Sequence, residues 1–172
     1  MNRTLLAGAC LLIATVTVAT VTDRVIIQKS ARQLTLLRNG RPLRSYHVSL
    51  GSNPKGAKER EGDERTPEGL YTIDRRNAYS KYHLALHVSY PNAADRARAR
   101  RLHVRPGGEI MIHGTPNRWR GLRVVFAHTD WTKGCIAVSD SDIEEIWRLV
   151  PNGSRRNPAV SAWRLTSLRQ QA

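Results

Sequence analysis

The segment DWTKGCIAVSDSDIEEIW, Asp130–Trp147, joins a glycine–cysteine pair to an amphipathic helix. Ser139 is a capping residue, and the apolar residues that follow it recur at the spacing of a buried helix face, which predicts a helix over Ser139–Val150. Gly134 permits close approach of the backbone beside Cys135, and the positive end of the helix would favour a thiolate there. The segment therefore predicts a reactive cysteine shortly before a helix.

Upstream, the segment EIMIH (Glu109–His113) predicts a strand that ends in a histidine. A cysteine nucleophile needs a base or a cationic partner, and His113 is the candidate. Backbone N–H groups at Gly134 and Cys135 are candidate donors to an oxyanion. Taken alone, these residues leave open that the histidine and the thiol are ordinary core side chains. A zinc site that uses Cys135, His113 and His128 is disfavoured because structural zinc sites take four ligands.

The rest of the chain reads as short strands separated by turns, with one further helix predicted over Asn92–Leu102. Asn39-Gly40 is a hairpin signal. Two long loops are predicted, a Gly-rich one of functional type over Gly51–Gly69 and a second over Thr115–Thr132. Many short strands with only two small helices predict a mostly-β sandwich or barrel. The predicted strands are Arg24–Lys29, Gln33–Leu37, Leu43–Leu50, Leu70–Asp74, Leu84–Ser89, Glu109–His113 and Ala159–Leu165.

The composition bounds the possible classes of protein. A chain of 172 residues with 40% hydrophobic residues allows one ordinary domain plus a targeting segment. Its net charge of +14 suits polyanions such as nucleic acid, an anionic membrane or an anionic wall polymer. Nucleic acid is not an expected partner, because the basic residues are dispersed and no nucleic-acid motif is present. The two cysteines, Cys10 and Cys135, exclude a disulfide-stapled miniprotein and a multi-cysteine metal site.

Residues 1–19 have the pattern of a secretory signal peptide: a positive Arg3, an apolar run from Leu5 and small residues before a cut near Ala19. An uncleaved membrane anchor is the alternative, because the uncharged stretch Leu5–Thr22 is close to the length that spans a bilayer. Removal of the leader would leave Cys135 as the only thiol in an oxidising compartment, where cysteines are usually paired. A lone exported thiol is buried, forms an intermolecular link, or is kept for its chemistry.

IHGTPN at Ile112–Asn117, followed by the Asp130–Trp147 segment, resembles the L,D-transpeptidase catalytic domain family (YkuD type), in the branch with a DWT-x-GCIAV segment. EGDERTPEGLYTI (Glu61–Ile73) and HLALHVSYPNAADRARA (His83–Ala99) are similar to the same branch. The resemblance runs from about residue 23 to residue 165, and we expect the catalytic domain over residues 23–168. It implies a mostly-β sandwich or barrel with a few short helices, and a location in the periplasm or cell envelope.

The resemblance also implies a role for each matching residue. Cys135 matches the family nucleophile and His113 the histidine that serves as general base and acid. Gly114 matches the residue whose carbonyl holds the imidazole tautomer. Thr132 and Gly134 match the Ser/Thr-x-Gly-Cys motif, so we expect an orienting or oxyanion role for Gly134 and a substrate contact for Thr132. No metal or cofactor is implied.

Two positions depart from the family pattern. Lys133 stands where histidine is common before the Gly-Cys pair, and Ala137 stands where arginine is common two residues after the cysteine. Lys133 either lowers the pKa of the thiol and contacts substrate, or faces solvent. The missing arginine removes a candidate contact to a substrate carboxylate, and Arg123 is the expected replacement.

The implied activity is acyl transfer from a peptidoglycan stem peptide, through an acyl-enzyme, to an amine, in cell-wall biogenesis or remodelling and in cell shape. The acceptor would be another stem peptide or a wall-linked protein. The alternatives are a hydrolase of the same fold, either an L,D-carboxypeptidase or an amidase that releases wall-linked protein, and a basic wall- or polyanion-binding protein without catalysis. Membrane contact is expected only through an uncleaved leader.

Overall fold

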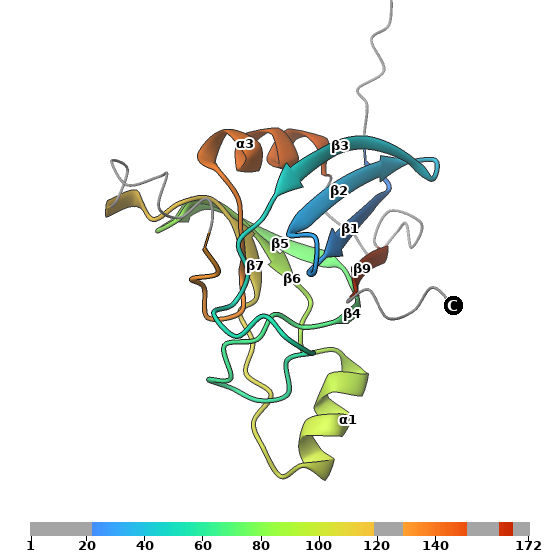
Figure 1. The fold of residues 1–172 in the computed structure, drawn as a ribbon, viewed down its shortest axis with the longest axis vertical. Helices are drawn as coiled ribbons and strands as arrows, with labels where there is room; N and C mark the ends of the chain where they lie inside the picture. Colours follow the sequence, from blue (N-terminus) through green and yellow to red (C-terminus); the bar gives the residue numbers. More distant parts are fainter. Residues whose placement is uncertain (1–21, 119–128, 151–161, 167–172) are drawn as a thin grey trace, which may run out of the picture.

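The computed structural model describes residues 22–118 and 129–150, and the backbone of residues 162–166 (Figure 1). Its strands form two sheets that share one hydrophobic core. The five-stranded sheet has the order β3 (Arg41–His47), β2 (Gln33–Arg38), β1 (Arg24–Gln28), β9 (Ala162–Thr166) and β4 (Gly69–Tyr71). The four-stranded sheet has the order β5 (Ile73–Ser80), β6 (His83–Val88), β7 (Met111–His113) and β8 (Ile136–Ala137).

The first sheet follows directly from its sequence pattern. In β1, Val25 and Ile27 are buried and alternate with more exposed residues, so one face points to the core. Asn39 and Gly40 both have positive φ angles, 50° and 74°, as a tight hairpin turn requires. This turn makes β2 and β3 antiparallel neighbours, whereas β1 and β9 pair in parallel.

The strands differ from the sequence-based expectation in three places. The predicted strand Leu70–Asp74 is divided between β4, in the first sheet, and β5, which continues to Ser80 because it pairs with β6. β8 was not predicted, and it exists because Ile136–Ala137 pairs in parallel with β7. In the first sheet, β3 ends at His47 instead of Leu50, because the chain then turns across to the second sheet, where Ser49 bridges Ala137.

The two helices of the described residues lie at opposite ends of the structure (Figure 1). α3 (Asp140–Leu149) is capped by Ser139 and packs against β6 and β7, burying Ile143 and Ile146. α1 (Ala93–Arg101) begins with a capping box between Asn92 and Asp95. Both helices therefore lie within one residue of their predicted bounds. Among the described residues, no helix has the length and apolar character to cross a membrane.

Several predicted features lie outside the described residues. They include the leader over residues 1–19, most of the predicted loop Thr115–Thr132, and the first part of the predicted strand Ala159–Leu165. Cys10, Arg123 and His128 also lie there.

Candidate active site

The cysteine lies at the end of a tight turn that leads into β8. The hydroxyl of Thr132 donates a hydrogen bond to the carbonyl of Cys135 at 2.8 Å and accepts one from the Gly134 N–H at 3.1 Å. Gly134 has φ +117°, a conformation that other residues rarely adopt. The Thr-x-Gly-Cys sequence thus builds the turn by local bonding. Since the Gly134 N–H is used inside the turn, the Cys135 N–H is the remaining candidate donor to an oxyanion.

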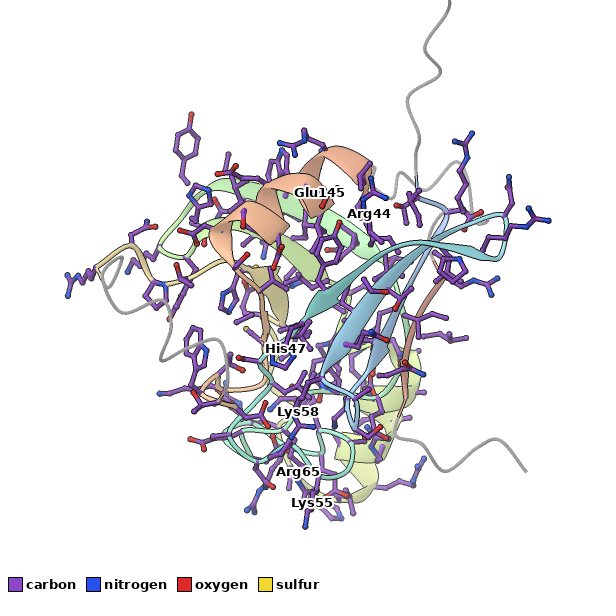
Figure 2. All side chains as sticks on the ribbon, turned by 45° about the horizontal axis from the view of Figure 1, so that its top comes forward. Arg44, His47, Lys55, Lys58, Arg65 and Glu145 are labelled. Atoms are coloured by element: carbon purple, nitrogen blue, oxygen red, sulfur yellow. The ribbon has the colours of Figure 1, made fainter. Side chains whose placement is uncertain are left out.

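The loop between β3 and β4 packs its backbone against this turn. A Cβ atom added to Gly134 would lie 2.6 Å from the carbonyl oxygen of Arg65, and one added to Gly51 would lie 1.9 Å from that of Glu64. Both glycines are therefore needed for close backbone approach. Figure 2 shows Lys58 and Arg65 together in this loop.

A buried ion pair holds the loop in shape. Lys58 Nζ lies 2.7 Å from Asp63, and both side chains are nearly inaccessible. Asp63 also accepts hydrogen bonds from the backbone N–H groups of Glu59, Arg60 and Arg65. Desolvation raises the pKa of Asp63, but these hydrogen bonds outweigh it and hold the pKa at about 2. The sequence does not reveal Lys58 as buried, because it lies in a polar, Gly-rich stretch.

His113 lies at the end of β7 and is almost fully buried. Its Nδ1 is 2.7 Å from the carbonyl oxygen of Gly114. A carbonyl only accepts hydrogen bonds, so Nδ1 carries the proton and Nε2 carries the lone pair. Burial lowers the pKa of His113 to about 4. The imidazole is therefore neutral at physiological pH, in the tautomer that can accept a proton at Nε2.

Two aromatic rings pack against the imidazole. The ring centroid of Tyr82, from the β5–β6 hairpin, lies 4.5 Å from that of His113, and the ring of Trp131 lies edge-on at 5.8 Å. Trp131 is fixed by its neighbour Asp130, which accepts hydrogen bonds from the Arg32 guanidinium at 2.9 Å and from the Leu50 N–H at 2.9 Å. The rings of Tyr82 and Trp131 also lie 6.2 Å apart, so the three rings form one aromatic cluster that holds the imidazole in place.

The surroundings of Cys135 favour the protonated form of its thiol. Cys135 Sγ donates to the carbonyl oxygen of Glu109 at 3.6 Å. Burial raises the pKa of the Cys135 thiol and the negative charge of Glu109 adds to this, whereas a hydrogen bond from the Met111 backbone and the charge of Lys58 act in the opposite direction. The expectation that the helix start would favour a thiolate is therefore wrong. β8 separates the thiol from the first turn of α3, and burial dominates.

The thiol and the imidazole line one pocket, which has a volume of about 360 Å³. Among the described residues, no hydrogen bond joins Cys135 to His113. The hydrogen bond between a catalytic pair is often long in the free enzyme and shortens only when substrate binds. The pocket, called the thiol pocket below, is lined by Asn77, Ser80, Tyr82, Ala85, Glu109, Met111, His113, Trp131, Thr132, Lys133 and Cys135.

The structure brings most of the predicted site residues together. Lys133 lines the thiol pocket, and its side chain is exposed. The cation whose charge lowers the pKa of the Cys135 thiol is Lys58. Residues that sequence reasoning missed are Glu109, Tyr82 and Trp131, which reach the pocket from three separate segments. Only the position of Trp131 in the DWT segment offered a signal. Within the described ranges, no three His, Cys, Asp or Glu side chains are grouped to hold a metal ion.

Comparison with known proteins shows which family this fold belongs to. The family model of the L,D-transpeptidase catalytic domain (YkuD) matches residues 22–160. The Escherichia coli K12 protein named "Putative L,D-transpeptidase YafK" is 33% identical over 111 residues, which is 63% of this chain and 37% of that protein. The chain thus spans little more than a third of the length of this relative.

Solved structures agree at the level of the fold. The helical cell shape determining protein Pgp2 of Campylobacter jejuni superposes with a TM-score of 0.60 at 25% identity, over 84% of this chain and 46% of Pgp2. An L,D-transpeptidase from Mycobacterium smegmatis superposes with a TM-score of 0.50 at 14% identity, over 84% of this chain and 58% of that one.

The chain belongs to the L,D-transpeptidase catalytic domain family. The family resemblance read from the motifs and the predicted mostly-β fold are both confirmed.

Proposed function

We propose that this protein is a cysteine-dependent L,D-transpeptidase that acts on peptidoglycan stem peptides, with Cys135 as nucleophile and His113 as general base and acid. The observation that carries the proposal is the hydrogen bond from His113 Nδ1 to Gly114, which leaves the Nε2 lone pair available in the pocket that holds the thiol. The low pKa of the imidazole and the raised pKa of the thiol make a neutral pair, so proton transfer accompanies attack.

In the first step, the Cys135 sulfur attacks the carbonyl carbon of the peptide bond between an L-centre and the terminal D-residue. The thiol proton passes to His113 Nε2, and the carbonyl oxygen becomes an oxyanion near the Cys135 N–H. The C–N bond then breaks, and His113 returns the proton to the leaving amine. The products are a thioester on Cys135 and a free D-amino acid.

In the second step, an amine of another stem peptide or of a wall-linked protein attacks the thioester. His113 takes a proton from the attacking amine and returns it to the sulfur as the C–S bond breaks. A new amide bond remains, and the enzyme returns to its starting state. Attack by water in place of the amine would make the protein an L,D-carboxypeptidase or amidase.

The test is incubation of the purified protein with muropeptides, with and without an added amine acceptor, followed by mass analysis of the products. We expect release of the terminal D-amino acid together with a cross-linked product that depends on the acceptor. Shortened peptide without any cross-linked product would identify the hydrolase. A folded Cys135→Ala variant serves as the control, and full activity in that variant would overturn the proposal.

We further propose that the protein acts in the cell envelope, after removal of a leader near Ala19. The support is the charge and apolar pattern of residues 1–19 together with the wall substrate proposed above. N-terminal sequencing of exported material decides this point, because an intact Met1 in the membrane fraction would favour an anchor.

A further inference from the structure

One turn of the first sheet contacts a segment of the candidate active site. Residues 29–32 connect β1 to β2, and the side chain of Arg32 extends from this turn to Asp130. Asp130 immediately precedes Trp131, whose ring lies edge-on to the imidazole of His113 at 5.8 Å. Arg32 and Asp130 are 98 residues apart in the chain, so only the fold brings them together.

The contact between Arg32 and Asp130 is bidentate. Arg32 Nε lies 3.0 Å from Oδ1 and 2.9 Å from Oδ2 of the carboxylate, and Nη2 lies 2.5 Å from Oδ2. The two side chains are 31% and 16% exposed, so the pair is partly shielded from water. The Leu50 N–H also donates to Oδ1 of Asp130 at 2.9 Å. A carboxylate that is bound through both oxygens by a planar guanidinium has a fixed orientation.

The backbone conformation at Arg32 is one that suits glycine. Its φ angle is +50°, in the left-handed region where residues with a side chain are uncommon. The Arg32 N–H donates to the carbonyl of Lys29 at 3.2 Å, and the Arg32 carbonyl accepts from the Val48 N–H at 2.9 Å. Glycine would form the same two backbone bonds, but it would not bind Asp130. Strained residues of this kind cluster at functional sites, which points to a role for the Arg32 side chain.

The ring of Trp131 has open space beside it. It lines the thiol pocket and also a second pocket of about 310 Å³, and the two pockets share no other lining residue. A ring that borders two cavities depends for its orientation on the backbone that carries it. That backbone is anchored at the preceding residue, Asp130, by the contact with Arg32.

We propose that Arg32 is a positioning residue for catalysis, which binds Asp130 and thereby keeps the ring of Trp131 against the imidazole of His113. The imidazole then keeps its orientation and stays shielded from water. This inference rests on the function proposed above. It adds to the site a residue of the first sheet that does not itself line the thiol pocket.

The test replaces Arg32 by glycine, which removes the guanidinium and tolerates the positive φ angle. The first readout is the acylation of Cys135 by a stem-peptide donor, with the rate expressed per reactive thiol. We expect kcat to fall by roughly tenfold to 100-fold, because a small displacement of a catalytic group has a cost of this size. KM should stay within about twofold, because Arg32 does not contact substrate. Arg32→Lys should recover only part of the rate, because lysine cannot form the bidentate contact.

The second readout, an NMR titration of the His113 imidazole, needs no substrate. Burial holds the pKa of His113 at about 4, so entry of water beside a displaced Trp131 should raise this pKa toward 6.5 in Arg32→Gly. Arg32→Lys keeps the positive charge, so a rise that it shares does not come from loss of charge. The other ionisable residues around the imidazole are Tyr82, Glu109, Lys133 and Cys135, which line the pocket with it, and Asp140 of α3, which accepts a hydrogen bond from the Thr115 N–H.

Two comparisons show whether Arg32 acts through Trp131. In a Trp131→Ala background, Arg32→Gly should change kcat little, because the ring that it positions is already absent. The matched control is Arg44→Gln, which should leave kcat and the pKa of His113 unchanged. Arg44 on β3 forms an ion pair with Glu145 on α3 at 3.0 Å but does not line the thiol pocket (Figure 2).

The outcomes separate this inference from the proposed function. If the wild-type protein acylates Cys135 but Arg32→Gly leaves kcat or the pKa of His113 unchanged, the role of Arg32 is overturned and the proposed function stands. An equal loss of kcat in the Trp131→Ala background, or an equal effect of Arg44→Gln, would overturn it as well. Arg32→Lys decides the question by the same criteria if the glycine variant does not fold. If the wild-type protein does not acylate Cys135, the proposed function fails and this inference fails with it.

Discussion

His113 Nδ1 lies 2.7 Å from the carbonyl oxygen of Gly114, the residue that follows it in the chain. The bond determines which ring nitrogen carries the proton. Nδ1 holds it, so Nε2 has the lone pair with which the imidazole can act as a base. Tyr82 and Trp131 keep the ring in that orientation. The proposed role of His113 as general base depends on this hydrogen bond.

Replacement of His113 by alanine should lower the rate of Cys135 acylation by roughly 10²–10⁴-fold, the usual cost of a lost general base. His128→Ala should cost far less, although His128 lies closer to Cys135 in sequence. The measurement is the acylation rate followed by mass spectrometry over pH 5–9. If His128→Ala is the more damaging variant, the assignment of the base to His113 is wrong.

The buried imidazole should make folding stability depend on pH. Burial lowers the pKa of His113 from 6.5 to about 4, so between these values the unfolded chain binds a proton that the folded protein does not. As far as His113 is concerned, the folded protein is therefore most stable above pH 6.5. Its free energy of unfolding falls as the pH drops toward 4, by about 3 kcal/mol in total. Urea unfolding at several pH values measures it. A His113→Gln variant should lack this part of the pH dependence, and equal slopes in both proteins would contradict the burial argument.

The Thr132 hydroxyl should be needed for the turn before Cys135. Thr132→Val keeps the shape of the side chain but loses its bonds to the Cys135 carbonyl and the Gly134 N–H. We expect a loss of about 1–3 kcal/mol in the free energy of unfolding, together with slower acylation. Thr132→Ser should restore most of both quantities. Equal behaviour of the valine and serine variants would show that the hydroxyl is not what holds the turn.

Gly134→Ala should disrupt the packing of the loop against this turn. The variant has to accommodate φ +117° and a Cβ atom 2.6 Å from the Arg65 carbonyl oxygen. We expect a cost of about 2–4 kcal/mol, from backbone conformation and overpacking together. The control is Gly62→Ala, because Gly62 also has a positive φ, +76°, but has open space around its Cβ position. Chemical denaturation measures the loss in the free energy of unfolding for each variant, and the difference between the two losses is the cost of the close contact with Arg65. Equal losses would contradict the claim that this contact is costly.

Local signals in the sequence predicted the elements that depend on nearby residues. The caps at Asn92 and Ser139 and the turn at Asn39-Gly40 act within a few residues, so the sequence shows them directly. β8 escaped prediction because two residues, Ile136 and Ala137, form a strand only through pairing with a distant partner.

The same distinction holds for the site. His113 and Cys135 stand in motifs that can be read from the chain, and so does Gly114. Lys58 is buried in an ion pair with the nearby Asp63, which a polar, Gly-rich stretch of sequence does not indicate. The position of Glu109 beside the thiol arises from a contact between segments far apart in the sequence. For the same reason, the sequence led to the wrong direction for the thiol pKa, because a nearby helix start is visible in the sequence and burial is not.

The most direct test of the central claim is to trap the acyl-enzyme. The protein is incubated with a stem-peptide donor, quenched in acid and digested with trypsin, which cuts after Lys133 and Arg148 and so isolates Cys135 in one peptide. We predict that this peptide gains the mass of the donor's acyl group, and that a folded Cys135→Ser variant forms no thioester. Release of the terminal D-amino acid by a Cys135→Ser variant at the wild-type rate, or an acyl group found on another residue, would contradict the claim that Cys135 is the nucleophile.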